Sequence, residues 1–264
     1  MDVCMQSLFL GIVQGLTELL PISSSAHLNL IPWMFNWNNL SPSFDVALHF
    51  GTLLAIVLFF FNDWLALVKG GYNIAIKKEK TTEGEMFWYI TLATIPGGII
   101  GFLLDNFLED KLKKPLIIAM ALIVMGIILY YVDKKCESKI KYEQMKLKET
   151  FIIGISQAMA FIPGVSRSGI TMTVARLMKI DRESSAKYSF MLSAPIVLVA
   201  TIFKFNNFSL NLEFFIGVIA SFLTGVIVIK FLLEYLKNGS FKTFAVYRIL
   251  AGLVVFVVYY IKIQ

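Results

Sequence analysis

Residues 14–27 read QGLTELLPISSSAH, and this polar stretch lies inside an otherwise apolar N-terminal segment. It carries Glu18, three consecutive serines and His27, where a membrane-crossing helix would carry apolar side chains. Pro21 cannot continue a helix, because it lacks a backbone N–H and its ring clashes with the preceding turn. We therefore expect two short helices that meet at a polar break, rather than one continuous span.

The composition predicts a membrane protein. Hydrophobic residues make up 57% of the 264 residues and charged residues only 16%, whereas soluble domains contain about 25% charged residues. The apolar residues form long runs rather than amphipathic stripes, which favours an all-α integral membrane protein with several spans. The net charge of +6 does not indicate nucleic-acid binding, because the lysines lie mostly in short loops between apolar runs.

Six apolar runs are long enough, or nearly so, to cross a bilayer, which takes roughly 20 residues. The stretch 151–180 resembles the N-terminal stretch 3–35, because Pro163, Gly164 and the sequence SRSG interrupt it. Non-helical backbone survives at membrane depth only where protein or water satisfies its polar groups, so we expect both stretches to be re-entrant helical hairpins. The six predicted transmembrane helices are 44–61, 86–104, 115–132, 188–204, 212–235 and 244–262.

The lysines predict the orientation of these spans. Loops 62–85 and 133–150 carry four and six lysines, so the positive-inside rule places both loops in the cytoplasm and both termini outside. The first hairpin then enters from outside and the second from inside, each followed by three spans, which is an inverted-topology repeat. We expect one membrane domain, 1–264, whose halves 1–132 and 151–264 are joined by the cytoplasmic loop 133–150.

A weak internal similarity supports the repeat. At a constant offset of 143 residues, five positions of the first hairpin match identical residues in the second, whereas Pro21 and Pro163 miss this offset by one. Inverted repeats with broken helices place their binding site near the membrane midplane, where we expect the two breaks to meet. The matched pairs are Gly11 and Gly154, Ile12 and Ile155, Gln14 and Gln157, Ser23 and Ser166, and Ser25 and Ser168.

The first break carries the residues for a cation and for a nucleophile. Gln14 and Glu18 are four residues apart and share one helix face, so they are suited to hold a divalent cation. An ionisable side chain in a membrane interior is a functional candidate by default. Ser23 or Ser24 is expected to cap the next helix, whose free N–H groups attract anions. His27 is a candidate general base or nucleophile, and Ser24 is a candidate nucleophile if His27 activates it.

The second break reads PGVSRSGIT at residues 163–171. Arg167, which lies between two glycines at membrane depth, is suited to bind phosphate through its planar guanidinium. The alternative is an ion pair between Arg167 and Glu18, and both hold in turn if Glu18 releases Arg167 when substrate and metal arrive. This combination of groups suits phosphoryl transfer. The further candidates for phosphate binding are Ser23, Ser25, Ser166, Ser168 and Thr171.

Two polar residues outside the breaks, Asp45 and His49, are four residues apart in the first full span. They either line the cavity or lie near its mouth, and the sequence favours neither. The two cysteines, Cys4 and Cys136, are far apart without metal-ligand spacing, so we expect neither a disulfide nor a metal site from them.

Both motifs resemble the signatures of a known family. QGLTELLPISSSAH is similar to an E/Q-x-x-x-E pair followed by P-x-S-S-x-x-H, and PGVSRSGIT is similar to P-G-x-S-R-S-x-x-T. The family is that of the undecaprenyl-diphosphate phosphatases of the bacitracin-resistance type, and the resemblance covers nearly the whole chain. It implies an anhydride hydrolase of the bacterial inner membrane, which cleaves undecaprenyl diphosphate to undecaprenyl phosphate and inorganic phosphate. This reaction recycles the lipid carrier of peptidoglycan synthesis, and thereby serves cell-wall biogenesis and bacitracin resistance.

The resemblance also implies site residues and a cofactor. The metal pair, for Mg²⁺ or Ca²⁺, falls on Gln14 and Glu18, where the glutamine puts in doubt any mechanism with two carboxylates on the metal. The catalytic residues fall on Glu18, Ser24, His27 and Arg167, with the nucleophile open between Ser24 and His27. We expect the site to open to the extracytoplasmic side. The expected partners are the lipid substrate and the bilayer, and no nucleic acid is expected. The resemblance is also compatible with a homodimer.

The rival interpretation is a secondary transporter or lipid flippase for a phosphate-bearing substrate, since inverted repeats around a midplane site are typical of transporters. Transport needs binding and alternating access but no nucleophile or base. Release of phosphate by the purified protein therefore distinguishes the two.

Overall fold

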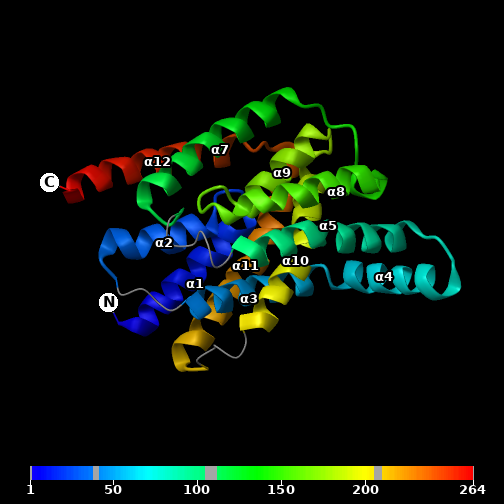
Figure 1. Ribbon diagram of the computed structural model, residues 1–264, viewed down its shortest axis with the longest axis horizontal. Helices are drawn as coiled ribbons and strands as arrows, with labels where there is room; N and C mark the ends of the chain where they lie inside the picture. The colour runs from blue at the N-terminus through cyan, green and yellow to red at the C-terminus, as the bar shows by residue number, and fades with distance from the viewer. Residues whose placement is uncertain (1, 38–41, 105–111, 205–209, 264) are drawn as a thin grey trace.

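The chain is helical in the part that the computed structural model describes, residues 2–37, 42–104, 112–204 and 210–263. Within these ranges the β-structure is an isolated parallel bridge between Ile140 and Ile180. In chain order the helices are α1 (Val3–Leu19), α2 (Ser24–Phe35), α3 (Pro42–Phe59), α4 (Phe61–Tyr72), the π-helix η1 (Asn73–Lys77), α5 (Thr82–Leu104), α7 (Pro115–Lys135), the 3₁₀-helix η2 (Tyr142–Gln144), α8 (Leu147–Ser156), the 3₁₀-helix η3 (Gln157–Phe161), α9 (Arg167–Leu177), α10 (Arg182–Lys204), α11 (Leu212–Asn238) and α12 (Lys242–Ile263) (Figure 1).

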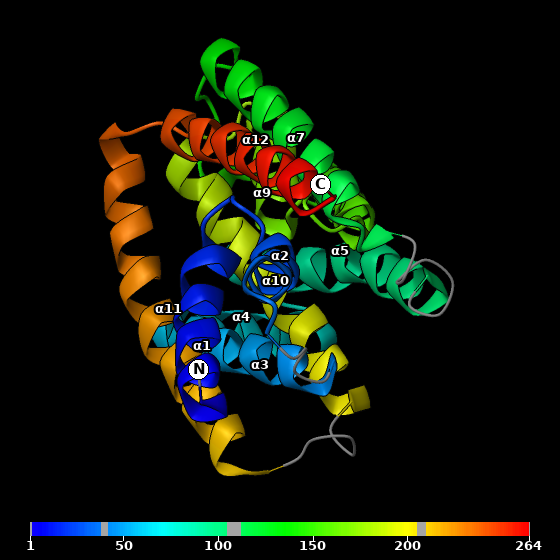
Figure 2. The ribbon, with the colours of Figure 1, turned by 90° about the vertical axis from the view of Figure 1, so that its left-hand side faces the viewer.

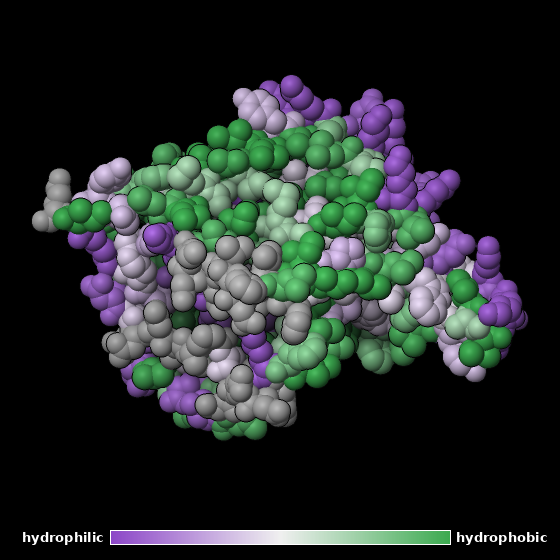
Figure 3. All heavy atoms as spheres, viewed as in Figure 1, coloured by the Kyte–Doolittle hydropathy of each residue, from purple (hydrophilic) through white to green (hydrophobic). Residues whose placement is uncertain are grey.

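Several of these helices are suited to cross a membrane. Among the described residues, α7, α10, α11 and α12 are long and apolar enough, and the pair of α3 and α4, bent by 79°, would supply a fifth span. Large apolar side chains point outward, such as Ile227 and Leu250, which are 68% and 57% exposed. Figure 3 shows a broad hydrophobic surface that polar side chains border. The prediction of an all-α, multi-pass membrane protein is confirmed.

Each of the six predicted spans coincides with a helix, but the predicted loop 62–85 is wrong, because it contains α4 and η1. The lysines of this segment indicate a loop, whereas its small residues let it pack as a helix on α5. Leu67 is buried, and a Cβ on Gly70 would lie 2.6 Å from the backbone nitrogen of Gly84. Figure 1 shows α4 and α5 side by side.

Both predicted breaks are present as turns between helices. The turn 20–23 joins α1 to α2, and the turn 162–166 joins η3 to α9. The caps of α2 and α9 are Ser23 and Ser166, whose side chains accept a hydrogen bond from a first-turn N–H at 3.3 and 3.0 Å. Both serines have positive φ angles, 76° and 72°, a conformation that costs about 1–3 kcal/mol outside glycine. The same strained cap thus occurs twice, at the predicted offset of 143 residues.

Helices that are far apart in the sequence lie side by side. α1 packs along α11, and α7 along α12 (Figure 2). Small residues allow α1 and α11 to approach closely, since a Cβ on Gly11 would lie 2.6 Å from the carbonyl oxygen of Gly217. α8 packs against α5 in the same manner, with Gly154 directly against Ala93.

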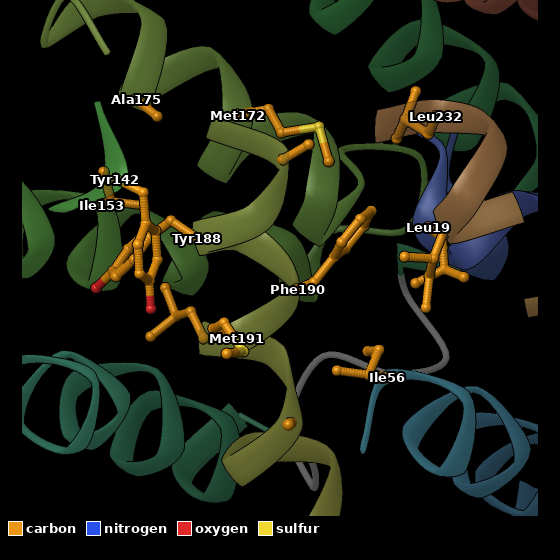
Figure 4. Close-up of a cluster of buried hydrophobic side chains, with 14 of the residues drawn as sticks. Leu19, Ile56, Tyr142, Ile153, Met172, Ala175, Tyr188, Phe190, Met191 and Leu232 are labelled. Carbon is orange, nitrogen blue, oxygen red and sulfur yellow. The ribbon is translucent and has the colours of Figure 1, made fainter. Parts of the chain in front are cut away.

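The largest apolar cluster fixes the end of α1. Leu19 packs with Ile56 of α3, Phe190 of α10 and Leu232 of α11, and each of these side chains is at most 2% exposed (Figure 4). Because Leu19 directly follows Glu18, this packing holds the carboxylate at the start of the first break.

Candidate active site between the two breaks

The two breaks meet at a cavity of about 260 Å³. Its polar side comes from both breaks, and its apolar side comes mainly from α3, η3 and α10. The residues that the breaks contribute are Glu18, Ser24, Ser25, Ser166, Arg167 and Ser168. The expectation that the breaks converge is therefore confirmed.

Glu18 is the centre of the polar contacts and is only 6% exposed. One carboxylate oxygen accepts a hydrogen bond from Nη2 of Arg167, and the other accepts one from Oγ of Ser24. The second oxygen also lies 3.3 Å from Nδ1 of His49 and 3.3 Å from Nε2 of Gln14. A buried charge needs this degree of pairing, because it has lost its contact with water.

The two terminal nitrogens of Arg167 differ in their contacts. Nη2 binds Glu18, whereas Nη1 is buried without a hydrogen-bond partner among the described residues. A buried donor without a partner costs free energy, and an anion in the cavity would satisfy it. A guanidinium is well suited to such an anion, because its planar N–H groups match the oxygens of a phosphate. The ion pair with Glu18, which was the alternative left open for Arg167, is present in the structure and leaves Nη1 as a donor for phosphate.

Two helix N-termini open toward the same point. α2 begins at Ser24 and α9 at Arg167, so their first N–H groups have no carbonyl partner within the helix. The hydroxyl of each capping serine lies close to the hydroxyl two residues later, at 3.2 Å for Ser25 and 3.1 Å for Ser168. Ser168 also donates to the carbonyl oxygen of Leu20 at 3.0 Å, which ties the breaks together. Converging helix N-termini and hydroxyls favour binding of an anion.

Gln14 and His49 contact Glu18, whereas Gln157 lines the cavity and Gln14 does not. Gln14 and Gln157, which the repeat pairs, are 0% and 3% exposed, and each has an amide oxygen without a hydrogen-bond partner among the described residues. His49 lines the cavity, with its Nδ1 2.9 Å from Nε2 of Gln14. Asp45 is not among the lining residues. Of the two positions left open for this pair, His49 thus takes the inner one.

His27 lies outside the cavity lining. Its Nδ1 is 2.7 Å from the carbonyl oxygen of Ser23, and its Nε2 is 2.7 Å from the hydroxyl of Tyr247 on α12. No described contact joins His27 to Ser24, whose hydroxyl donates to Glu18 instead. In this arrangement the base available to Ser24 is Glu18.

Two predicted phosphate-binding residues also lie outside the lining. Ser23 serves as the cap of α2. Thr171 donates to the carbonyl oxygen of Arg167 at 2.8 Å and lies 2.7 Å from the hydroxyl of Ser189. Its hydroxyl therefore ties α9 to α10.

Arg248 of α12 contacts both breaks although it belongs to neither motif. It is 0% exposed, and its Nη1 donates to the carbonyl oxygen of Pro21 at 3.0 Å. Its Nη2 donates to the carbonyl oxygens of Gly164 and Val165 at 2.7 and 2.8 Å. The available signal was an arginine inside the predicted span 244–262, because an ionisable residue there indicates function.

Known proteins resemble this chain along nearly its whole length. A model of the family described as bacitracin resistance protein BacA matches residues 7–254. An undecaprenyl-diphosphatase of Pelotomaculum thermopropionicum is 47% identical over 255 residues, which cover 96% of this chain and 95% of that protein. One of Caldicellulosiruptor bescii is 45% identical over 263 residues, covering 97% and 98%. One of Desulforudis audaxviator is 43% identical over 256 residues, covering 96% and 97%.

Proposed function

Since the chain belongs to the bacitracin resistance protein BacA family, we propose that it hydrolyses undecaprenyl diphosphate to undecaprenyl phosphate and inorganic phosphate. This reaction recycles the lipid carrier of peptidoglycan synthesis and confers bacitracin resistance. The observation that carries the chemistry is the position of Ser24, which lines the cavity, begins a helix and donates a hydrogen bond from its hydroxyl to Glu18.

The terminal phosphate binds between the two helix starts. Nη1 of Arg167 supplies the unpaired donor, and the first N–H groups of α2 and α9 supply the rest. The hydroxyls of Ser25, Ser166 and Ser168 line the same cavity. These donors stabilise the charge on the phosphoryl oxygens as the bond to the leaving group lengthens.

Ser24 is the nucleophile, and Glu18 is its general base. Oγ of Ser24 attacks the terminal phosphorus, its proton passes to Glu18, and the bond from phosphorus to the bridging oxygen breaks, so that undecaprenyl phosphate leaves. After Glu18 returns this proton to solvent, it takes a proton from a water molecule that attacks the phosphoserine. The bond from phosphorus to Oγ of Ser24 then breaks, Oγ takes this proton from Glu18, and inorganic phosphate leaves. His27 holds the carbonyl of Ser23 and thereby keeps the start of α2 in place.

A divalent cation, Mg²⁺ or Ca²⁺, would be held by Glu18 and Gln14. Both are buried oxygen donors, and the amide oxygen of Gln14 has no hydrogen-bond partner in the described ranges, which fits a hard cation. Among the described residues no group of three or more His, Cys, Asp or Glu could hold a metal, so substrate phosphates and water would complete the shell, as is usual for Mg²⁺. When bound, the ion would neutralise charge on the phosphates.

The isoprenoid chain of the substrate occupies the apolar side of the cavity. Phe161 of η3 and Ile196 of α10 line this side beside Gly97 of α5. Gly98, the next residue of α5, is exposed, and a Cβ there would meet no atom within 4 Å. The isoprenoid chain thus extends between α5 and α10 toward the lipid bilayer.

The proposed topology is six spans and two re-entrant hairpins in an inverted repeat, with halves 1–132 and 151–264. Adding 143 to the bounds of α2 gives 167–178, which is α9 to within one residue, and adding 143 to those of α3 gives 185–202, inside α10. Each half also packs its first hairpin helix on a span of the other half. α1 of the first half packs on α11 of the second, and its counterpart α8 of the second half packs on α5 of the first.

The proposed site opens to the extracytoplasmic side of the bacterial inner membrane. Lysines gather after α4 and after α7, which the positive-inside rule assigns to the cytoplasm. Figure 1 places both termini at the end of the molecule opposite to these two turns, which supports a common, outward side for the termini.

A phosphate-lipid transporter or flippase is the second candidate, because the exchanged packing of the two halves suits alternating access. The test is release of inorganic phosphate from undecaprenyl diphosphate by the purified protein with Mg²⁺, compared with Ser24→Ala. We expect release by the wild type and almost none by the variant. Movement of labelled lipid across vesicles by wild-type protein that releases no phosphate would overturn the hydrolase in favour of transport.

A further inference from the structure

Arg248 contacts the site through backbone atoms of both breaks. One of its terminal nitrogens binds the carbonyl of Pro21 in the first break, and the other binds the carbonyls of Gly164 and Val165 in the second. These carbonyls lie just before the two helix starts, at Ser24 and Arg167. A single rigid guanidinium therefore fixes how the two helix starts face each other.

The second break is shaped around this side chain. A Cβ on Gly169 would lie 2.5 Å from Nη1 of Arg248, so only glycine leaves room for the guanidinium there. Gly164 has a φ of 98°, a conformation that suits glycine and turns its carbonyl oxygen to Nη2 of Arg248. Both glycines of the second motif are thus matched to an arginine that is distant in the sequence.

The groups that surround the charge of Arg248 also differ from those around Arg176, the other fully buried arginine. Arg176, at the far end of α9, has Nε 3.1 Å from the carboxylate of Asp133. In the described part of the chain, the hydrogen-bond partners of Arg248 are all carbonyl oxygens, the fourth being that of Leu122 at 3.5 Å. An unneutralised charge is expensive to bury, and its field adds to the attraction for an anion between the helix starts.

We propose that Arg248 is a positioning residue of the phosphate site, which holds the starts of α2 and α9 at the separation where both bind one phosphate. It is not among the described residues that line the cavity, and it acts through Pro21, Gly164 and Val165. This inference rests on the proposed phosphatase function, because the phosphate between the helix starts is that of the substrate.

The proposal separates Arg248 from a residue that merely stabilises the fold. Arg248→Lys keeps the charge but reaches the carbonyls of only one break at a time, and Arg248→Met loses both contacts and charge. We expect inorganic phosphate to inhibit Arg248→Met at least about tenfold more weakly, with a similar rise in KM, and Arg248→Lys to lie between it and the wild type.

Arg176→Met is the matched control, because Arg176 is also fully buried and also donates to backbone carbonyls, those of Ile180 and Cys136 at 2.5 Å. Arg176 lies ten residues after Ser166, the cap of α9, which is about 15 Å along the helix. We expect this control to lower the melting temperature but to leave KM and phosphate inhibition as in the wild type.

The experiment uses full-length protein in detergent micelles and measures KM for undecaprenyl diphosphate, inhibition by inorganic phosphate, and melting temperature. Wild-type KM and phosphate inhibition in Arg248→Met, or a loss of affinity of equal size in Arg176→Met, would overturn the proposal. If Arg248→Met does not fold, Arg248→Lys decides, and wild-type phosphate inhibition there has the same meaning. If the wild type releases no phosphate, the proposed function fails instead, and binding of inorganic phosphate to the variants still tests the positioning role.

Discussion

Glu18 and Arg167 are 149 residues apart in the sequence and form an ion pair across the two breaks. Their side chains are 6% and 16% exposed, so both charges depend on each other in the absence of water. Arg167 has hydrogen-bonding capacity left in this pair, because its Nη1 has no partner within the described part of the chain. Arg167 therefore serves as the structural partner of a carboxylate and retains a donor for a substrate phosphate.

Arg167→Lys should lower the rate on the order of tenfold or more, because an ammonium keeps the charge but cannot hold Glu18 and a phosphate in one plane. The measurement is kcat/KM for undecaprenyl diphosphate. Arg182→Lys is the control, since Arg182 pairs with Asp133 outside the cavity and should leave kcat/KM unchanged. Wild-type activity in Arg167→Lys would exclude a guanidinium that holds Glu18 and the phosphate at the same time.

Ser24→Ala should lower the turnover rate to about a thousandth of the wild-type rate or less, because it removes the attacking oxygen. Ser25→Ala should cost much less, since this neighbouring hydroxyl lines the cavity but does not contact Glu18 in the described structure. Substrate labelled in its terminal phosphate, quenched in acid, should leave label on wild-type protein and none on Ser24→Ala. Label that persists on Ser24→Ala would assign the nucleophile to another residue, with His27 the first to examine.

Glu18→Gln should lower the rate to near background and abolish the dependence of the remaining rate on Mg²⁺. It removes the general base of Ser24, which is also the only carboxylate among the described residues that line the cavity. Gln14→Leu should raise the Mg²⁺ concentration for half-maximal activity and leave the ion pair with Arg167 intact. Titration of the rate with Mg²⁺ checks both. A titration curve unchanged in Glu18→Gln would place the cation at other residues.

Gly11→Ala should lower the melting temperature, because the added Cβ would meet the carbonyl oxygen of Gly217 at 2.6 Å and push α1 away from α11. Overpacking of this kind costs about 1–3 kcal/mol. Gly98→Ala is the control within another helix, since its Cβ would meet no atom within 4 Å and alanine favours a helix over glycine by about 0.5–1 kcal/mol. Equal melting temperatures for the two variants would contradict the close contact of α1 and α11.

The breaks were predictable because local chemistry determines them. Pro21 ends a helix, serines begin one, and glycine allows the turn at Gly164, so both turns and the capping role of Ser23 follow from neighbouring residues. Helix α4 was not, because its lysines resemble those of a loop, while its packing depends on Gly84 in another helix.

The partners of the site residues were only partly predictable. The pairing of Glu18 and Arg167 follows from the convergence of two motifs that bear opposite charges. The contact of His27 with Tyr247 joins residues 220 positions apart, without a motif around the second one. The same holds for Arg248, which binds backbone carbonyls, because every residue offers a carbonyl and the sequence therefore carries no trace of the pairing.

The two native cysteines test the proposed orientation. Cys4 lies near the N-terminus in α1, and Cys136 directly follows α7, so the proposed topology puts Cys4 on the outer side and Cys136 in the cytoplasm. Both are free and partly exposed.

A membrane-impermeant maleimide should label Cys4 in right-side-out vesicles and Cys136 in inside-out vesicles, with Cys4→Ser and Cys136→Ser to assign each signal. The reverse pattern would turn the protein over in the membrane and direct the phosphate site to the cytoplasm. Labelling of both cysteines from one side would mean that an odd number of crossings no longer separates them, and would remove the inverted repeat.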